Sequence, residues 1–167
     1  MHGYIARYDM ENEKCCCFTG HRPHLLKRQE DDIRVDLENS ILHSVSEGFT
    51  TFISGIAPGV DIWAAEIVVR LKQSRPELHL VAAIPYPGFD EQWDETWRVR
   101  YRILLSQAEY VKVMEPEYSK ASYQERNEWM VCHSSKVIAV YNGQPGGTRN
   151  TIRHARLCKV PVLFLPG

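Results

Sequence analysis

Hydrophobic and polar residues follow two alternating patterns along this chain of 167 residues. Short apolar runs rich in β-branched residues predict buried strands, whereas apolar residues that recur every three or four positions predict helices with one buried face. The predicted strands cover residues 14–19, 50–54, 78–84, 110–114, 136–141 and 160–165, and the predicted helices cover 30–47, 62–72, 93–108, 122–134 and 148–158. This alternation, with no repeat and no linker-like segment, is typical of the α/β class. We therefore expect one three-layer α/β/α domain over residues 14–167, with a mostly parallel sheet of about six strands and right-handed crossovers.

The ends and faces of the helices give further predictions. Asp61 stands where an N-cap belongs, and Ser122 and Glu125 have the spacing of a capping box. Helix 62–72 is apolar over most of its circumference, so we expect one face on the sheet and another against a second copy, giving a homodimer. Residues 1–13 are polar and are expected to form an N-terminal arm.

Composition excludes several classes of protein. Hydrophobic residues make up 44% of the chain and charged residues 25%, as in ordinary globular proteins. The formal net charge of −1 argues against a protein that binds bulk polyanions. No apolar run approaches the roughly 20 residues of a membrane span, and the polar N-terminus is no signal peptide, so we expect a cytoplasmic protein without membrane partners.

Five cysteines occur, and three of them are consecutive at residues 15–17. Neighbouring residues of a strand face opposite ways, so this run predicts core packing rather than a disulfide framework. The sequence has no CxxC pair, and neither His21 nor His24 has a cysteine or carboxylate close by to complete a ligand set. We therefore expect no metal site.

Three glycine-containing loops follow predicted strands, at residues 19–23, 54–61 and 142–148. The carboxyl ends of parallel strands meet at one edge of a sheet, so these loops are expected to converge. Glycine lets the backbone approach a ligand, and free amides at a helix N-terminus attract an anion. A tight turn with nothing bound is the plainer interpretation of any one loop, but three together favour a phosphate-bearing, nucleotide-type ligand.

The loops match neither of two standard nucleotide motifs. Their glycine spacing is not GxGxxG, and the chain has no Gly-Lys-Ser/Thr step. NAD in its usual pose and P-loop ATP hydrolysis are therefore disfavoured.

Several motifs together resemble a known family. They are Thr19-Gly-His-Arg-Pro23, Ser54-Gly-(x)₃-Gly-Val-Asp61, Trp63-Ala-Ala-Glu66, Arg126-Asn127 and Gly146-Gly-Thr148. This combination is similar to the YpsA-like branch of the SLOG superfamily, which also holds the DprA and LOG (lysine-decarboxylase-like) proteins. The resemblance covers about residues 14–165. It implies a Rossmann-like fold whose glycine loops bind nucleotides or nucleotide-derived ligands, and many members act as ligand sensors.

The candidate ligand-binding residues come from the three loops and from these motifs. They are Thr19, Gly20, His21, Arg22, Ser54, Gly55, Gly59, Asp61, Glu66, Arg126, Asn127, Gly146, Gly147, Thr148 and Thr151. Arg22 has the forked donor geometry that suits a phosphate, and Thr148 and Thr151 have hydroxyl groups to donate to one. We assign no catalytic residue.

The LOG enzymes of the superfamily cleave a nucleoside monophosphate to free base and ribose phosphate, using a Pro-Gly-Gly-x-Gly-Thr-x-x-Glu motif. Here Pro145-Gly-Gly147 is followed by Thr148-Arg-Asn-Thr-Ile-Arg-His154, and no carboxylate occurs between Thr148 and the C-terminus. Glycosidic cleavage commonly needs carboxylates to activate water and stabilise an oxocarbenium-like centre. The departure from the motif therefore argues against this chemistry, unless Asp61, Glu66 or Glu125 supplies the acid.

Other polar and aromatic residues have plainer interpretations. We expect surface ion pairs for Arg98 and Arg102, and core packing for Trp93 and Trp97, although Trp93 is close enough to the loop edge to stack on a base. The last helix has a basic side that could contact DNA as in DprA, but the neutral overall charge favours a solvated face. Its members are Arg149, Arg153, Arg156 and Lys159.

The sequence thus favours binding or sensing of a nucleotide or nucleotide-derived small molecule, without catalysis. LOG-like hydrolysis of an N-glycosidic bond is the alternative, and single-strand DNA binding comes third. The expected small-molecule partner is a nucleotide derivative, with phosphate over the glycine turns and the base near Asn127 or Trp93.

Overall fold

The computed structural model describes residue 10 and residues 14–167, so the predicted arm lies outside the described residues apart from Met10. The strands are β1 (Cys15–Gly20), β2 (Thr51–Ser54), β3 (His79–Ile84), β4 (Tyr110–Val113), β5 (Lys136–Tyr141) and β6 (Val162–Pro166). The helices are η1 (Pro23–Leu25, a 3₁₀ turn), α1 (Glu30–Ser46), α2 (Val60–Lys72), α3 (Glu95–Gln107), α4 (Ser122–Cys132) and α5 (Gly147–Leu157). No described helix is long and apolar enough to cross a membrane.

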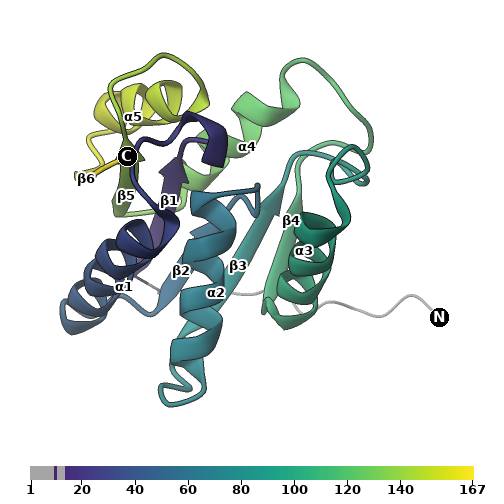
Figure 1. Ribbon diagram of the computed structural model, residues 1–167. Coiled ribbons are helices and arrows are strands. Elements are labelled where there is room, and N and C mark those ends of the chain that lie inside the picture. Colours follow the sequence, from purple (N-terminus) through teal and green to yellow (C-terminus); the bar gives the residue numbers. More distant parts are fainter. Residues whose placement is uncertain (1–9, 11–13) are drawn as a thin grey trace.

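All six strands join one sheet in the order β4-β3-β2-β1-β5-β6, and every neighbouring pair is parallel (Figure 1). The predicted Rossmann-like α/β fold is therefore confirmed. The first four strands extend the sheet from β1 in one direction, and β5 and β6 extend it in the other. The strand order thus reverses between β1 and β5, and ligands of such sheets bind beside that point.

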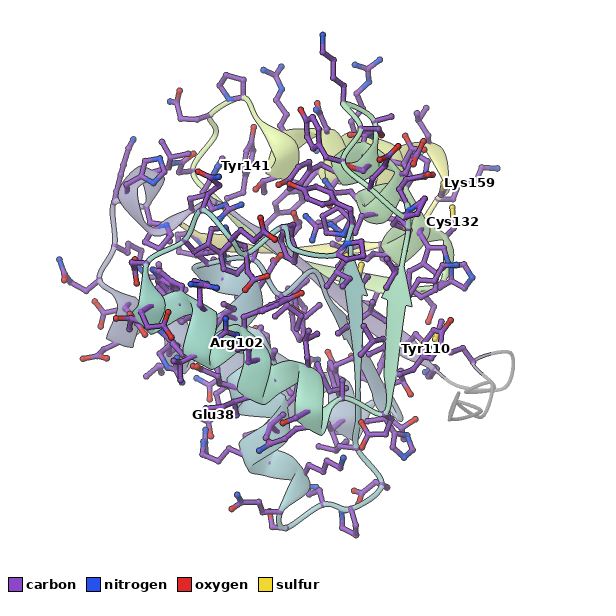
Figure 2. All side chains as sticks on the ribbon, turned by 90° about the vertical axis from the view of Figure 1, so that its right-hand side faces the viewer. Glu38, Arg102, Tyr110, Cys132, Tyr141 and Lys159 are labelled. Carbon is purple, nitrogen blue, oxygen red and sulfur yellow. The ribbon has the colours of Figure 1, made fainter. Side chains whose placement is uncertain are left out.

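Helices cover both faces of the sheet (Figure 1). Helices α1, α2 and α3 pack on one face, and α4 and α5 pack on the other. Figure 2 shows these layers from the β4 side, with Arg102 of α3 on one side of the strands and Cys132 of α4 on the other. Within β1, Cys16 faces the first group of helices, whereas Cys15 and Cys17 face the second. The cysteine run therefore fills the core on both faces, because small apolar side chains suit a central strand covered on two sides.

Helix α2 lies between α1 and α3 over the middle of the sheet. Its residues Ile62, Ala64, Ala65 and Val68 have no solvent exposure. The wide apolar surface that led us to expect a homodimer is thus covered by helices of the same chain.

Two predicted helix caps are wrong. Gly59, not Asp61, is the N-cap of α2, and a φ of 98° there explains why the chain uses glycine. Asp61 lies inside the first turn, where its carboxylate is free to face a cavity. The predicted capping box of α4 does not form, because the amide of Ser122 donates instead to the hydroxyl of Ser119 (3.1 Å).

Helix α3 starts two residues later than predicted. Its N-cap is Asp94, whose carboxylate accepts a hydrogen bond from the amide of Trp97 (3.2 Å). The indole of Trp93, which precedes this cap, packs edge-on against Phe89 and Tyr101. The aromatic pattern therefore continues through the loop into the helix, which is why the sequence placed the boundary too early.

Candidate functional site

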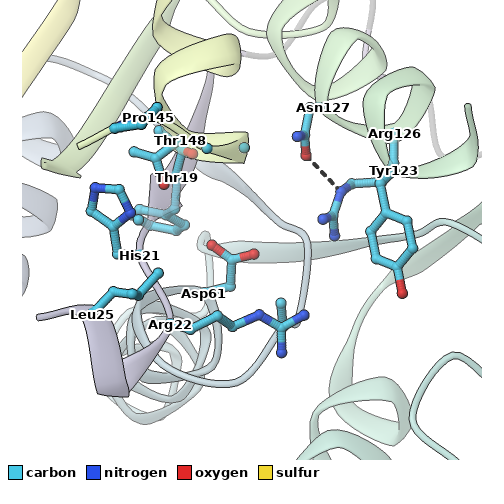
Figure 3. A pocket seen from close by; sticks show the side chains of 15 residues that line it. Thr19, His21, Arg22, Leu25, Asp61, Tyr123, Arg126, Asn127, Pro145 and Thr148 are labelled. Carbon is cyan, nitrogen blue, oxygen red and sulfur yellow. Dashed lines mark hydrogen bonds between the residues drawn. The ribbon is translucent and has the colours of Figure 1, made fainter. Parts of the chain in front are cut away.

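A cavity of about 210 Å³ opens at the carboxyl edge of the sheet, between β1 and β5. Its walls come from the end of β1 and η1, the β2–α2 loop, α4, and the loop before α5 (Figure 3). The lining residues are Phe18, Thr19, Gly20, His21, Arg22, Leu25, Ala57, Asp61, Tyr123, Arg126, Asn127, Pro145, Gly146, Gly147 and Thr148. The cavity thus lies at the point where the strand order reverses, as expected for a ligand site in this architecture.

The N-terminus of α5 forms one wall of the cavity. Gly146 is the N-cap, with a φ of 141°, and no side chain caps the helix. The amide of Asn150 makes the first bond of the helical series, to the carbonyl of Gly146 (3.1 Å). The three amides ahead of it have no carbonyl of their own helix to reach. This end of α5 contains no acidic residue in its first turn, so its dipole and amides provide a seat for an anion.

Glycine keeps this wall open. A side chain at Gly146 would meet nothing within 4 Å, and one at Gly147 would first meet the side-chain nitrogen of Asn127, 3.9 Å away. The space between Gly147 and Asn127 therefore belongs to the cavity and not to packed side chains. The hydroxyl-bearing Thr148 is buried beneath it.

Three charged residues meet on the opposite wall: Arg22, Asp61 and Arg126. Figure 3 shows the carboxylate of Asp61 turned into the cavity, beside Arg22. Burial raises the pKa of Asp61, and the positive charges of Arg126 and Arg22 oppose that rise. Burial likewise lowers the pKa of Arg126, while Asp61 opposes the shift. The wall thus brings one carboxylate near two guanidinium groups in a weakly solvated setting, which strengthens electrostatic contacts with a ligand.

The ring of His21 contains one buried nitrogen without a hydrogen-bond partner among the described residues. Its ring stacks on Tyr141 with centroids 5.5 Å apart, and only 4% of the residue is exposed. Burial lowers the pKa of His21, a shift that Asn142 opposes. The Nε2 atom is buried and has no hydrogen-bond partner among the described residues. A buried polar atom left unpaired is costly, so Nε2 reduces the stability of the fold at this point.

Comparisons with known proteins identify the family. A model of the YpsA family, described as the YspA SLOG family, matches residues 16–157. The chain belongs to this SLOG family. A UPF0398 protein of Halalkalibacterium halodurans is 29% identical to this SLOG chain over 143 residues, which cover 81% of the chain and 76% of the relative.

Solved structures share the fold of this SLOG chain. The DNA processing protein A (DprA) of Streptococcus pneumoniae matches with a TM-score of 0.65 at 17% identity. That match covers 95% of the SLOG chain but only 52% of the pneumococcal protein. DprA of Helicobacter pylori, whose structure is described for its single-stranded DNA binding mode, matches with a TM-score of 0.67 at 19% identity, over 95% of the SLOG chain and 67% of its own.

The predicted loops do converge in this SLOG chain, but they contribute unequally. The loops after β1 and β5 line the cavity directly. The loop after β2 contributes Ala57 and Asp61, whereas Ser54, Gly55 and Gly59 are turned to internal contacts. The hydroxyl of Ser54 accepts a hydrogen bond from the amide of Ile56 (3.1 Å) and donates to the carbonyl of Asp61 (2.8 Å). The glycines of this loop therefore allow close packing and do not cradle an anion.

Gly55 and Gly59 show this packing role most clearly. A Cβ atom at Gly55 would lie 2.1 Å from Nη1 of Arg126, and one at Gly59 would lie 2.9 Å from Cδ of Pro23. Each glycine thus makes room for a side chain of another segment. We predicted that the loop glycines face a ligand; for these two the structure places protein atoms there instead.

Two further candidates lie away from the cavity. Glu66 accepts hydrogen bonds from Arg100 (2.6 and 2.8 Å) and from Arg34 (2.8 Å), so it joins α2 to α3 and α1. Thr151 is buried and donates its hydroxyl to the carbonyl of Gly147 (3.0 Å), inside α5. Both residues support the fold in this state and neither lines the cavity.

Sequence reasoning missed five residues of the cavity wall. They are Phe18, Leu25, Ala57, Tyr123 and Pro145. Tyr123 is the most informative, because it lies one turn before Asn127 on α4 and its hydroxyl is 3.1 Å from that of Tyr86. Helical spacing from the predicted Arg126 and Asn127 is the signal that could have found it.

The arginines and the tryptophan for which we expected structural roles, Arg98, Arg102 and Trp93, have those roles in the structure. Arg98 pairs with Asp90 and Glu95, and Arg102 pairs with Glu95, at 3.3 to 3.7 Å, as predicted. Trp93 packs with the core and does not line the cavity, although the guanidinium of Arg22 lies over its ring, 5.8 Å from the centroid.

Proposed function

We propose that this SLOG protein binds a phosphorylated, nucleotide-derived small molecule in the cavity between β1 and β5, and that it senses this ligand rather than converts it. One observation supports the proposal above all others. The uncapped N-terminus of α5 faces the same small space as Arg22 and Arg126. An anion there would be held by amides, by a helix dipole and by cations at once.

The size of the cavity suggests how such a ligand would lie. Its volume of about 210 Å³ is smaller than the roughly 300 to 1,000 Å³ of pockets that enclose drug-sized ligands. We therefore expect the sugar phosphate to occupy the cavity and the base to extend towards its mouth. Tyr123, whose ring forms part of the wall, offers an aromatic surface to that base. This replaces the expected base contact with Trp93, whose ring packs in the core.

A thermal-shift panel tests the proposal. The purified full chain is heated with inorganic phosphate, ribose 5-phosphate, the common nucleoside monophosphates and ADP-ribose, and free base is measured by chromatography in the same samples. We expect one nucleotide to raise the melting temperature more than ribose 5-phosphate does, with no base released. If none of the phosphorylated compounds shifts the melting temperature at millimolar concentration, the proposal fails.

Cleavage of an N-glycosidic bond is the second candidate function, because Asp61 is the one carboxylate among the described residues that lines the cavity. Its pKa is raised by burial, and a raised pKa suits a general acid. Glu66 is held by two arginines, and Glu125 lies outside the lining set. Base release that disappears in Asp61→Asn would establish this function in place of sensing.

Binding of single-stranded DNA is the third candidate, by analogy with the DprA fold. Four basic residues of this region are exposed. Arg149, Arg153 and Arg156 belong to α5, and Lys159 follows its C-cap. Because phosphate contacts weaken steeply with salt, retained affinity for an oligonucleotide at physiological salt is the deciding measurement. If the affinity is lost at physiological salt, the oligonucleotide is attracted only nonspecifically to the basic residues of α5.

A further inference from the structure

A second group of chemically active side chains lies at the far ends of α4 and α5. Both helices return from the carboxyl edge of a parallel sheet, so they run in the same direction and end at the opposite edge from the cavity. Cys132 is the last residue of α4, and Cys158 is the C-cap of α5. Figure 2 labels Cys132 and Lys159, which mark these two helix ends.

His154 lies one helical turn before Cys158, so the two side chains share a face of α5. That face is turned to α4, which packs beside α5 on the same side of the sheet. The Nε2 atom of His154 lies 3.6 Å from Sγ of Cys132 and 3.4 Å from Sγ of Cys158. The three ligand-type atoms all lie within 4.8 Å of one another.

These distances match the edges of a tetrahedral zinc site. With Zn–S of about 2.3 Å and Zn–N of about 2.0 to 2.1 Å, tetrahedral angles separate a bound sulfur from a bound nitrogen by about 3.6 Å. The two observed nitrogen–sulfur separations of 3.4 and 3.6 Å match this value, and the two sulfur atoms lie within 4.8 Å of each other. Two thiolates with one imidazole are also a ligand set that selects zinc over hard cations such as magnesium or calcium.

The surroundings favour a cation at this position. Cys132 and Cys158 are exposed and His154 is half-buried, so an ion can reach the three donors from solvent. Both cysteines lie at helix C-termini, where the helix dipoles present partial negative charge. Glu128, one turn before Cys132 on α4, lines the same groove as His154 and adds a negative charge, which Arg153 of that groove offsets.

We propose that Cys132, His154 and Cys158 bind a zinc ion, with water in the fourth position. Both thiols lose their protons on binding, so two thiolates balance the charge of Zn²⁺. The ion would join the end of α4 to the end of α5. These two helices also supply opposite walls of the cavity, through Asn127 on α4 and Gly147 on α5. The bound ion would therefore fix the spacing of those walls from the other edge of the sheet.

Cobalt substitution provides the first test. The full chain is reduced, stripped of metal with a chelator and titrated with Co²⁺, which gives a thiolate-to-cobalt charge-transfer band when cysteines are ligands. We expect the band to saturate at equimolar metal, Zn²⁺ to remove it by displacement, and Zn²⁺ to raise the melting temperature. Absence of the band in fully reduced protein overturns the proposal. If the reduced protein shows no cobalt band and peptide mapping of the unreduced protein finds a Cys132–Cys158 disulfide, the two cysteines form a redox pair and not a metal site.

Variants at the three positions provide the second test. Cys132→Ser, Cys158→Ser and His154→Gln should each weaken Zn²⁺ binding by more than about 100-fold, because even partners outside the ligand set are worth 10- to 100-fold. His133→Gln is the matched control, since His133 is exposed, adjoins Cys132 and is turned instead to the carbonyl of Trp129 (2.8 Å). Unchanged zinc affinity in both cysteine variants would overturn the assignment.

Discussion

The guanidinium of Arg126 donates a hydrogen bond to the main-chain carbonyl of Gly55, at 2.7 Å, across 71 positions of sequence. Its Nε also donates to the side-chain oxygen of Asn127 (2.8 Å). The arginine therefore fixes the β2–α2 loop against α4 and orients a cavity residue at the same time. Its position explains why the β2–α2 loop packs against protein atoms although its glycines favoured an anion-binding role.

Substitution of Gly55 tests this packing. In Gly55→Ala the new Cβ would lie 2.1 Å from Nη1 of Arg126 and 2.7 Å from Oδ2 of Asp61, so both side chains must move. We expect the free energy of unfolding to fall by about 1–3 kcal/mol, as in other overpacked cores, measured by urea denaturation. Gly147→Ala is the matched control, because its Cβ has 3.9 Å of room. If Gly55→Ala and wild type have the same free energy of unfolding, the guanidinium of Arg126 can move without loss of stability and the predicted packing role is wrong.

Arg22 is expected to contact the phosphate of the ligand. Arg22→Ala should raise the dissociation constant of the best nucleotide from the thermal-shift panel by roughly 10-fold or more, since a charge-assisted hydrogen bond is worth about 1.5–3 kcal/mol. Isothermal titration calorimetry measures this change. The exposed Arg102, which pairs with Glu95, provides the control variant Arg102→Ala. If the two variants bind equally well, the phosphate lies elsewhere.

The buried ring of His21 predicts a pH dependence of stability. Because burial lowers its pKa below the ordinary 6.5, the unfolded chain binds the proton more readily than the folded chain. Stability due to this residue is therefore complete above about pH 6.5 and falls on acidification, by at most about 1.4 kcal/mol per pH unit, until the folded pKa is passed. Melting curves of wild type and His21→Gln between neutral and mildly acidic pH should show a flatter profile for the variant. His24→Gln, at an exposed position, should keep the wild-type slope.

Glu66 should matter for stability and not for the ligand. Burial raises its pKa, but hydrogen bonds from Arg100 and Arg34 outweigh burial, so the pKa is lowered overall. The stabilisation is thus present above the ordinary carboxyl pKa and is lost as pH falls through the lowered value. Glu66→Gln should cost about 1–3 kcal/mol at neutral pH, between the values for exposed and buried ion pairs.

The control for this prediction is Glu38→Gln, which breaks the more exposed pair with Arg70 and should cost less than about 1 kcal/mol. Both variants are also titrated with the best nucleotide of the panel. A weakened ligand response in Glu66→Gln alone would return this residue to the binding site.

The fold was predictable because its signals are local. Apolar runs such as 137–140 are typical of buried strands, and their alternation with amphipathic helices favours a parallel sheet. The same reasoning placed the loops after β1 and β5 at one edge, where the structure brings Thr19 and Thr148 to one cavity. Strand order then brings these loops together without any specific contact between their side chains.

The details that failed depend on contacts between distant residues. Nothing near Gly55 or Glu66 in sequence indicates that Arg126 and Arg100 will occupy the space beside them. Likewise, Cys132 and His154 are 22 positions apart, and only the packing of α4 on α5 makes them neighbours. A sequence pattern shows which residue types follow a strand, but it does not show which side chain of a distant segment contacts them in the fold.

The burial of three consecutive cysteines in β1 gives the chain a built-in reporter of its own opening. Thiolates, not thiols, react with alkylating reagents, and burial raises the pKa of Cys16 and raises that of Cys17 to about 12. Modification of these sulfurs therefore requires the helices that cover β1 to move away from the sheet. The slow labelling rate of Cys16 reports opening on the side of α1, α2 and α3, and that of Cys15 and Cys17 reports opening on the side of α4 and α5, when each is followed by mass spectrometry.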